Sequence, residues 1–489
     1  MKKITAVVLS ILMVCTIGIS AFAADTDYAI SNPYADVNWE TYSAYKADLH
    51  SHTNASDGND TTKEMAERHY DLGFDIYAQS DHGTVNYSWT GKDSYDPTIK
   101  FIMMIKEGVA PIVTLDKEGT AENGKTYTVT TVDGDDYYAQ EDGHTMMRVP
   151  FANEQNPTSL NNAHVNTWFV DYGHGRLGGT SDYESVISAI DELGGVSVIN
   201  HPGEYTNARD EDNTADAYNK NNSTYNYYIN KFESILMDNP SCLGIDINSK
   251  GDSRTRFDRK LWDTMLTDLA PAGRNVFAIA STDAHNLDIV DSGYVMVMMP
   301  ELTSDALKEA LLAGSFFAQS CYCGNSDELA AYTEALLASE NAAAKALGEK
   351  MSVSVAAGDK YRFEQGATCV TVNSISVDDA EDAITIDADD ALYIRWISDG
   401  KVVAEGNSID LDECENIGSY VRAEIISEGA VTYTQAFLLE YDGMPEANVP
   451  ENFTDVDAPL LAFVDKIVRA LGKMISVIAQ PVLNVFGVV

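Results

Sequence analysis

The sequence is short of positive charge. It holds 32 lysine and arginine residues against 76 aspartate and glutamate residues, and its formal net charge is -44 over 489 residues. A strongly acidic surface repels polyanions, so long nucleic acid is not expected as a partner. A small phosphate is compatible with this charge, because bound metal ions can invert the local field.

Cysteine is also scarce, with six residues in the whole chain. This count is too low for a disulfide scaffold, and a chain of this length does not need one. Cys369 and Cys414 could form one bridge within a small β domain, and two free thiols are the alternative. Cys321 and Cys323 lie too close together for a metal knuckle, so we interpret them as structural.

Long apolar runs are rare outside the first residues. The chain opens with MKK, continues with an apolar stretch and reaches a small-x-small site at Ala21–Ala23. This is the pattern of a signal peptide over residues 1–23. We therefore expect a secreted or cell-envelope-associated protein, cleaved near Ala23.

Histidine provides the clearest signal among the residues that are present. The chain has nine histidines, and six of them lie in short motifs that also hold acids or that end apolar runs. The candidate ligands in these motifs are His50, His52, His82, Glu154, His164, His201, Asp283 and His285. Imidazole and carboxylate together are ligands of Zn, Mn or Fe, so the pattern predicts a multinuclear site with hydrolytic chemistry.

The spacing within the motifs suggests strand ends. Residues two apart on a strand face the same way, so His50 and His52 should share a face, as should Asp283 and His285. His82 and His201 also follow apolar runs, and Pro202 favours extended backbone at His201. Several ligands at strand ends predict one shared site.

Helical patterns over residues 61–73, 182–195, 259–273 and 304–315 alternate with strand patterns from about residue 45 to residue 320. Ligands at the ends of the strands are typical of a β/α barrel with its site at the C-terminal mouth, so we expect an α/β fold. Residues 108–150 interrupt the pattern with turn-rich hairpins and are expected to form an insertion. Residues 210–230 are rich in Asn, Asp and Tyr and are expected to form a solvated lid loop.

The C-terminal third has a different pattern. Residues 327–349 predict a helical linker, and short alternating strands over 352–442 predict a small β-sandwich, which contains no histidine. Residues 458–489 predict an amphipathic helix with Lys466, Arg469 and Lys473 on its polar face. This helix could lie on an anionic membrane surface or in the cell envelope, or pack on its own protein or a partner.

The motifs DLHSHTNASDG, SDHG, NHPGE and STDAH resemble the signature motifs of the PHP superfamily, named for polymerase and histidinol phosphatase. The resemblance covers a little over half of the chain and implies a distorted β/α barrel with about three divalent ions (Mn, Zn or Fe). It implies one ion held by His50, His52, Glu154 and Asp283, a second by Glu154, His164 and His201, and a third by Asp57, His82 and His285.

The resemblance also implies a reaction. A hydroxide shared between metals would attack phosphorus in a small nucleotide or sugar phosphate. Glu154, Asp283, His285 and Asp81 are the candidate catalytic residues. Asp81 points to the opposite face from His82, so it would either orient a ligand or be a carboxylate in a turn. Lys250, Arg254 and Arg256 are candidate phosphate contacts.

Three other functions stay open at this point. Some relatives of this type are exonucleases, so oligonucleotide ends are an alternative substrate. An amidohydrolase also uses an HxH motif on a barrel strand, but a fitting lysine bridge is missing here. A non-catalytic envelope-binding protein with structural metals is the last alternative. The oligomeric state is not predicted.

Overall fold

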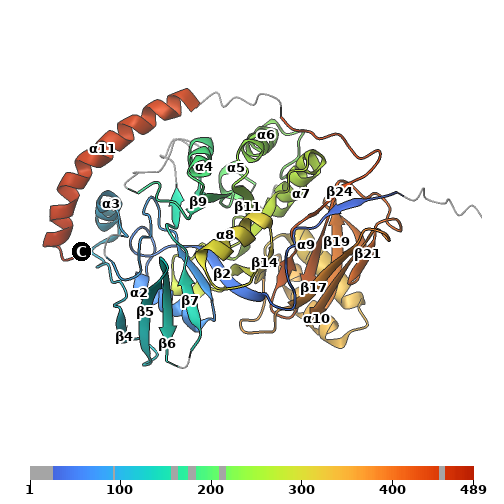
Figure 1. Ribbon diagram of the computed structural model, residues 1–489, viewed down its shortest axis with the longest axis horizontal. Helices are drawn as coiled ribbons and strands as arrows, with labels where there is room; N and C mark the ends of the chain where they lie inside the picture. Colours follow the sequence, from blue (N-terminus) through green and yellow to red (C-terminus); the bar gives the residue numbers. More distant parts are fainter. Residues whose placement is uncertain are drawn as a thin grey trace, which may run out of the picture.

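The computed structural model describes residues 26–91, 94–141, 143–155, 163–174, 183–208, 216–450 and 458–489. The expected signal peptide, residues 1–23, lies outside the described residues. Within them the chain is a mixed α/β protein, as the sequence predicts, and most of its strands belong to one large sheet, which the sequence did not predict (Figure 1).

The large sheet runs through the whole molecule. In spatial order its main strands are β1 (Ala29–Ser31), β24 (Phe437–Glu440), β22 (Tyr420–Ile426), β23 (Val431–Tyr433), β14 (Phe316–Ser320), β13 (Gly293–Met299), β2 (Ser43–Ser51), β3 (Ile76–Gln79), β7 (Thr145–Arg148), β6 (Asp135–Gln140), β5 (Thr126–Val132) and β4 (Glu118–Thr120). Strands β19 (Tyr393–Ser398) and β20 (Lys401–Glu405) branch from β22.

A second sheet faces the middle of the first. Its order is β12 (Phe277–Ala280), β11 (Cys242–Asn248), β10 (Val196–Ile199), β9 (Val165–Trp168) and β8 (Asn153–Gln155). Strands β10, β11 and β12 are parallel, whereas β9 is antiparallel to both of its neighbours. All residues of these strands are buried. Burial on both faces suits the apolar composition of β10 and β12, whereas β8 consists of polar residues and carries Glu154.

Two isolated parallel bridges join the sheets. One pairs Ser51, at the end of β2, with Ala284, and the other pairs His82 with Glu154. Each bridge lies beside candidate ligands, so the site forms where the two sheets meet. The pairing β2–β3 is parallel, but β13 is antiparallel to β2, so the strands do not form a uniform parallel series.

Helices α2 (Thr62–Asp71), α4 (Tyr183–Glu192), α7 (Asp258–Leu269) and α8 (Ser304–Ala313) form where the amphipathic patterns predict them. Thr61 begins α2 with a capping box to Glu64, and Gly314 ends α8 in a left-handed conformation (φ 78°). Helix α6 (Ser223–Asp238) corrects one expectation, because residues 223–230 are helical and not part of a lid loop. Tyr225, Ile229 and Phe232 bury one face of this helix.

The turn-rich segment before Glu154 forms strands β4 to β7. These are antiparallel neighbours, and β7 joins the large sheet beside β3 in parallel. The segment therefore extends the large sheet.

The C-terminal region begins with α9 (Ser326–Ala338) and α10 (Ala342–Ala357). Helix α10 extends past the point at which strands were expected. The strands that follow divide between two sheets: β17 (Thr371–Asp378), β18 (Ala383–Asp389) and β21 (Ser408–Asp410) form one, and β19, β20 and β22–β24 belong to the large sheet. Strand β23 pairs with β14, so the large sheet continues from the preceding part of the chain into this region.

The tail forms a long helix, α11 (Ala458–Val485), which lies beside α3 (Pro97–Glu107) along one side of the molecule (Figure 1). The Thr98 hydroxyl donates to the Gly472 carbonyl oxygen (3.1 Å), and the Tyr95 hydroxyl donates to Gln480 (2.8 Å). Among the described residues, no helix is long and apolar enough to cross a membrane.

Candidate metal centre

The structure brings all nine predicted ligands together. Their donor atoms form four overlapping groups, in each of which the atoms lie within 4.8 Å of one another. The groups are His52, Asp57, His82 and His285; His50, Glu154 and His201; His50, His52 and Asp283; and His82, Glu154 and His164. Residues from sequence positions 50 to 285 thus share one buried cluster.

Glu154 is at the centre of the cluster. One carboxylate oxygen lies 2.9 Å from His164 Nδ1 and 3.3 Å from His201 Nε2, and the other lies 2.9 Å from His82 Nδ1. The residue is fully buried on β8. Five imidazoles surround this carboxylate, including those of His50 and His52. A carboxylate in this position can bridge cations on either side.

His50 in β2 and His52, directly after the end of this strand, lie together as their spacing predicts. The Nε2 atoms of His50 and His52 lie 3.1 Å apart, and both rings are buried. His52 Nε2 also lies 3.2 Å from Asp283 Oδ1. The alternation of side chains along an extended strand is sufficient to explain this pair.

Two other ligands depend on backbone conformations that the sequence analysis did not foresee. His201 has φ 27° and Asp283 has φ 45°, both in the left-handed region. The expectation of extended backbone at His201 is therefore wrong, despite Pro202. Strand β12 ends at Ala280, so a turn and not strand alternation brings Asp283 and His285 to the same cluster. Such conformations are costly for residues other than glycine and persist where surrounding structure enforces them.

Asp57, His82 and His285 form the more accessible edge. The exposed fractions of their side chains are 30%, 17% and 22%, whereas those of Glu154 and Asp283 are 1%. His285 Nε2 lies 3.3 Å from Asp57 Oδ2. A ligand from solvent would reach this edge first.

Opposite charges dominate the electrostatics of the cluster. Burial and His82 lower the pKa of His52, but contacts with Asp283, Glu154 and Asp57 outweigh them and raise it to about 9. Burial lowers the pKa of His164 to about 4. Burial opposes ionisation of Glu154 and Asp283, yet the neighbouring cations and imidazoles hold both pKa values well below the usual range.

The donor set fits divalent metal ions. Several buried ligand atoms make no well-aligned hydrogen bond although other polar atoms lie close to them. They are Glu154 Oε2, both oxygens of Asp283, and Nδ1 of His50, His52, His82 and His201. Buried polar atoms are normally satisfied, so a group of unsatisfied ones in a single place needs a further partner. Neutral imidazole nitrogen and carboxylate oxygen suit Zn, Mn and Fe alike.

Other polar groups orient the ligands. Asn200 Nδ2 donates to Glu154 Oε1 at 2.8 Å, which fixes the central carboxylate. Asp48 Oδ2 accepts from His69 Nε2 (2.9 Å) and from the Thr282 hydroxyl (2.5 Å), next to Asp283. The sequence analysis missed these residues, although Asn200 directly precedes His201.

Asp81 supports the loop that carries Asp57. Its Oδ1 accepts from the amides of Thr53 (2.8 Å) and Ser56 (3.2 Å), and its Oδ2 accepts from the Thr53 hydroxyl and Gln79 (both 2.8 Å). We therefore assign Asp81 as a positioning residue and not as a catalytic one.

The predicted basic residues differ in their surroundings. Lys250 Nζ lies 3.0 Å from Asp283 and reaches the cluster directly. Arg254 pairs with Glu204, which is close to His201. Arg256 donates to the carbonyl oxygen of Ser253.

Tyr205 was not predicted. Its hydroxyl lies 2.8 Å from His164 Nε2, and only its position shortly after the NHPGE motif could have suggested it.

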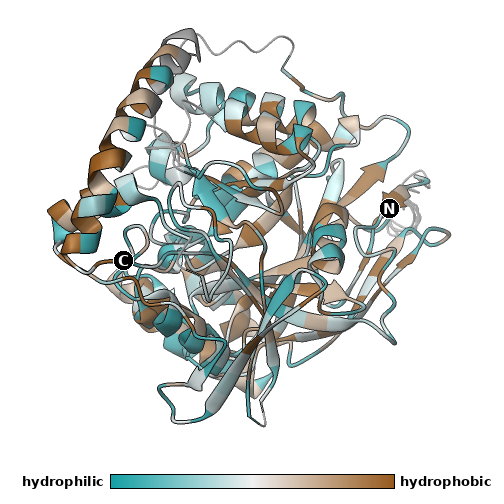
Figure 2. Cartoon of the chain, turned by 60° about the vertical axis from the view of Figure 1, so that its left-hand side comes forward, coloured by the Kyte–Doolittle hydropathy of each residue, from teal (hydrophilic) through white to brown (hydrophobic). Residues whose placement is uncertain are grey.

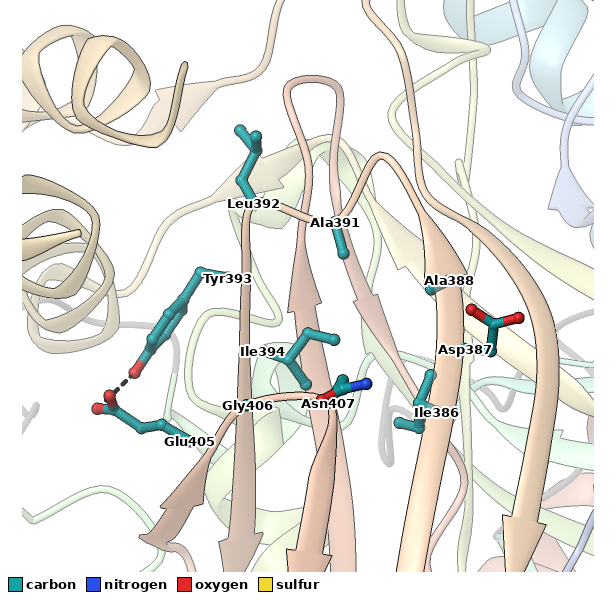
Figure 3. Close-up of a pocket in the computed structure, with 10 residues that line it drawn as sticks. All are labelled: Ile386, Asp387, Ala388, Ala391, Leu392, Tyr393, Ile394, Glu405, Gly406 and Asn407. Carbon is teal, nitrogen blue, oxygen red and sulfur yellow. Dashed lines mark hydrogen bonds between the residues drawn. The ribbon is translucent and has the colours of Figure 1, made fainter. Parts of the chain in front are cut away.

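A cavity of about 440 Å³ lies elsewhere, between strands of the C-terminal region (Figure 3). Tyr393 and Glu405 line it and are hydrogen-bonded to each other at 2.9 Å, and the remaining lining residues are mostly apolar. It contains none of the nine ligands, which agrees with the absence of histidine in this part of the sequence.

No family model matches the sequence, and no curated protein matches it significantly. Among solved structures, a two-domain protein from Bacteroides vulgatus, described as containing a predicted PHP-like metal-dependent phosphoesterase, is 13% identical. The match has a TM-score of 0.36 and covers 86% of this chain and 96% of that chain. That is the family whose motifs this sequence resembles.

Two further structures match over part of the chain. PsfC from Pseudomonas syringae is 13% identical with a TM-score of 0.29, over 55% of this chain and 88% of that chain. The lesion-specific endonuclease EndoQ from Pyrococcus furiosus is 14% identical with a TM-score of 0.29, over 55% and 56%. Because these TM-scores are low, we base the proposed function on the side chains of the cluster.

Proposed function

We propose that this protein is a PHP-type, metal-dependent hydrolase of small phosphate esters that acts after export. The convergence of six imidazoles and three carboxylates on one cluster supports this proposal. We further propose a distorted β/α barrel as the catalytic unit and a small β-sandwich in the C-terminal region.

Three cations are compatible with the overlapping groups. One cation would be held by His50, His52 and Asp283, and a second by Glu154, His82 and His164. A third would be held by Asp57, His52, His82 and His285. The remaining group, His50, Glu154 and His201, shares residues with the first two. Bound divalent ions supply Lewis-acid chemistry, which polarises a phosphoryl oxygen and makes water a better nucleophile at neutral pH.

The residues around the cluster select and orient the substrate. Lys250 Nζ, at the rim beside Asp283, can donate to a phosphoryl oxygen, and Arg254 can do so after leaving Glu204. Asn200 keeps Glu154 in place, and Asp81 keeps the Asp57 loop in place. Since the rest of the surface is strongly acidic, a small ester is a better substrate than a polymer.

Metal analysis and a phosphate-release assay test the proposal. The purified protein should contain or take up Mn, Zn or Fe and should release phosphate from a panel of phosphomonoesters. Glu154→Ala should abolish release, and Glu334→Ala, at an exposed glutamate on α9, should not.

Two results would contradict this function. Full metal occupancy without turnover of any phosphoester would favour a binding protein. Release of mononucleotides from single-stranded DNA in place of phosphate would favour an exonuclease.

A further inference from the structure

Helix α11 has two apolar faces. Gly472, Ala479 and Leu483 are buried on the face that packs against the protein. The opposite face carries large apolar side chains that remain exposed: Phe463, Ile467, Leu471, Met474, Val477, Ile478 and Val485. Met474 is 68% exposed and Val477 is 74% exposed. Packing against the protein therefore accounts for only one of the two faces.

The exposed face forms a continuous stripe. Positions 463, 467, 471, 474, 478 and 485 follow the spacing that places residues on one side of a helix. At 1.5 Å per residue the stripe is roughly 33 Å long. In Figure 2 brown, apolar residues recur along the length of this helix. Monomeric proteins rarely expose a continuous apolar surface of this extent without a binding role.

The neighbouring segment adds to the same surface. Ile105, at the end of α3, is 68% exposed, and Val109 and Val113 in the following loop are also exposed. The Ile112 amide donates to the Val488 carbonyl oxygen at 2.8 Å, which holds this loop against the end of the chain. The apolar surface thus includes two segments that are far apart in the sequence.

Basic residues flank the stripe. Residues 458–489 hold Lys466, Arg469 and Lys473 against a single acid, Asp465, in a chain whose net charge is -44. Lys466 and Lys473 are exposed, and Lys106 is exposed on α3. This is the composition of a helix that lies in the plane of a lipid surface and attracts anionic headgroups.

We propose that the outer face of α11, with Ile105, Val109 and Val113, docks on the surface of an anionic lipid bilayer. A second copy of the chain is a poorer occupant, because two such basic helices would repel each other, whereas anionic headgroups attract them. The helix lies on the bilayer without crossing it.

Docking would also set the position of the metal centre. The Pro111 carbonyl oxygen accepts from Asn54 Nδ2 (2.8 Å), and Lys100 of α3 donates to the Asn54 carbonyl oxygen. Asn54 belongs to the loop that carries Asp57, at the accessible edge of the cluster. The bilayer would therefore contact the wall of the site, and a phosphate ester near the membrane surface would be close to it.

Vesicle flotation tests the proposal. The exported protein is used, and mass spectrometry verifies its first residue, so that residues 1–23 cannot bind lipid themselves. It is mixed with vesicles of phosphatidylcholine alone or with vesicles of phosphatidylcholine and phosphatidylglycerol. We expect binding to the anionic vesicles only. Val477→Asp combined with Ile478→Asp should abolish it. The double variant Lys466→Gln, Lys473→Gln should weaken it roughly 25-fold, from about 1 kcal/mol for each lysine.

Matched controls are available on another surface. Val353→Asp changes a residue of similar exposure (69%) on α10, and Lys350→Gln removes a lysine from the same helix. Both variants should bind vesicles like the unmodified protein. Absence of binding to anionic vesicles would overturn the proposal, as would equal binding by the α11 variants. Self-association that the Val477 and Ile478 substitutions abolish, without lipid binding, would instead identify a second copy as the occupant. Because lipid binding is measured without turnover, its result is independent of the proposed hydrolase activity.

Discussion

The metal centre and the contact between α7 and the C-terminal strands both bury many charges, but they balance them differently. At that contact, Arg422 donates to Asp263 (2.8 Å) and to Glu424 (2.7 Å), and Arg395 also pairs with Glu424. In the metal centre the buried carboxylates face imidazoles, and several of their oxygens lack a hydrogen bond. The arginine network is complete within the chain, whereas the clustered imidazoles and carboxylates of the other region suggest binding of divalent cations.

The pKa shifts express the same contrast. Burial opposes ionisation of Glu424, but Arg395 and Arg422 outweigh it and lower its pKa to about 2. Arginine stays charged at any ordinary pH, so this balance is permanent. Imidazoles lose their protons near neutrality and then become metal ligands. In this chain the buried acids beside arginine form a closed network, and the acids among several imidazoles form the candidate metal centre.

The largest effect is expected from breaking the arginine network. Arg422→Ala leaves Asp263 with the Tyr420 hydroxyl but without its arginine, and leaves Glu424 with Arg395 alone of its two arginines. This should reduce the free energy of unfolding by about 3–5 kcal/mol. Chemical denaturation measures this loss, and metal content should be unchanged. Arg362→Ala, at an exposed arginine paired with Asp291, is the control and should cost about 1 kcal/mol or less. Equal losses of unfolding free energy in Arg422→Ala and Arg362→Ala would show that the buried network is no more stabilising than a surface ion pair.

Metal addition should stabilise the protein through the candidate metal centre and not through the arginine network. With free Mn or Zn at a hundred times its dissociation constant, the free energy of unfolding should rise by about 2.7 kcal/mol. Thermal unfolding with metal and after chelation measures this rise. Glu154→Ala should abolish it and Arg422→Ala should preserve it; a rise that persists in Glu154→Ala would place the metal elsewhere.

A smaller effect is expected at the residue that orients Glu154. Asn200→Ala removes the 2.8 Å hydrogen bond to Glu154 Oε1, and comparable changes lower metal affinity ten- to a hundredfold. Competition with a metal-binding dye measures the affinity. Asn373→Ala, at an exposed asparagine, should leave it unchanged. Unaltered affinity in Asn200→Ala would show that Glu154 is held by the metals alone.

The smallest effect is the change in the free energy of unfolding per pH unit that we expect from Glu233, a buried acid whose main charged neighbour is another acid, Asp268. Burial and Asp268 raise the pKa of Glu233 to about 10, so the folded protein retains a proton that the unfolded chain loses above its ordinary pKa of 4.5. Stability should therefore fall as pH rises through this window, by at most about 1.4 kcal/mol per pH unit. Unfolding at pH 7 and pH 8 should show this slope, and Glu233→Gln should reduce it. The exposed control Glu334→Gln should not.

The sequence predicted the ligands better than the elements that carry them. His50 and His52 lie as strand alternation requires, and the amphipathic helices α2, α4, α7 and α8 form where expected. The left-handed backbone at His201 and Asp283 was missed, because local propensity favours extended residues there and the surrounding fold overrides it. Helix α6 replaced part of an expected loop, since burial of Tyr225, Ile229 and Phe232 outweighs its polar composition.

The sequence by itself determined which side chains can bind metal and which face of the tail is apolar, because residue identity and spacing carry both kinds of information. Only the tertiary structure decided that Glu154 lies among five imidazoles, that β23 continues the large sheet from β14, and that α11 buries one apolar face and exposes the other. These contacts join residues far apart in the chain, and their geometry depends on how the two sheets pack and not on any local pattern.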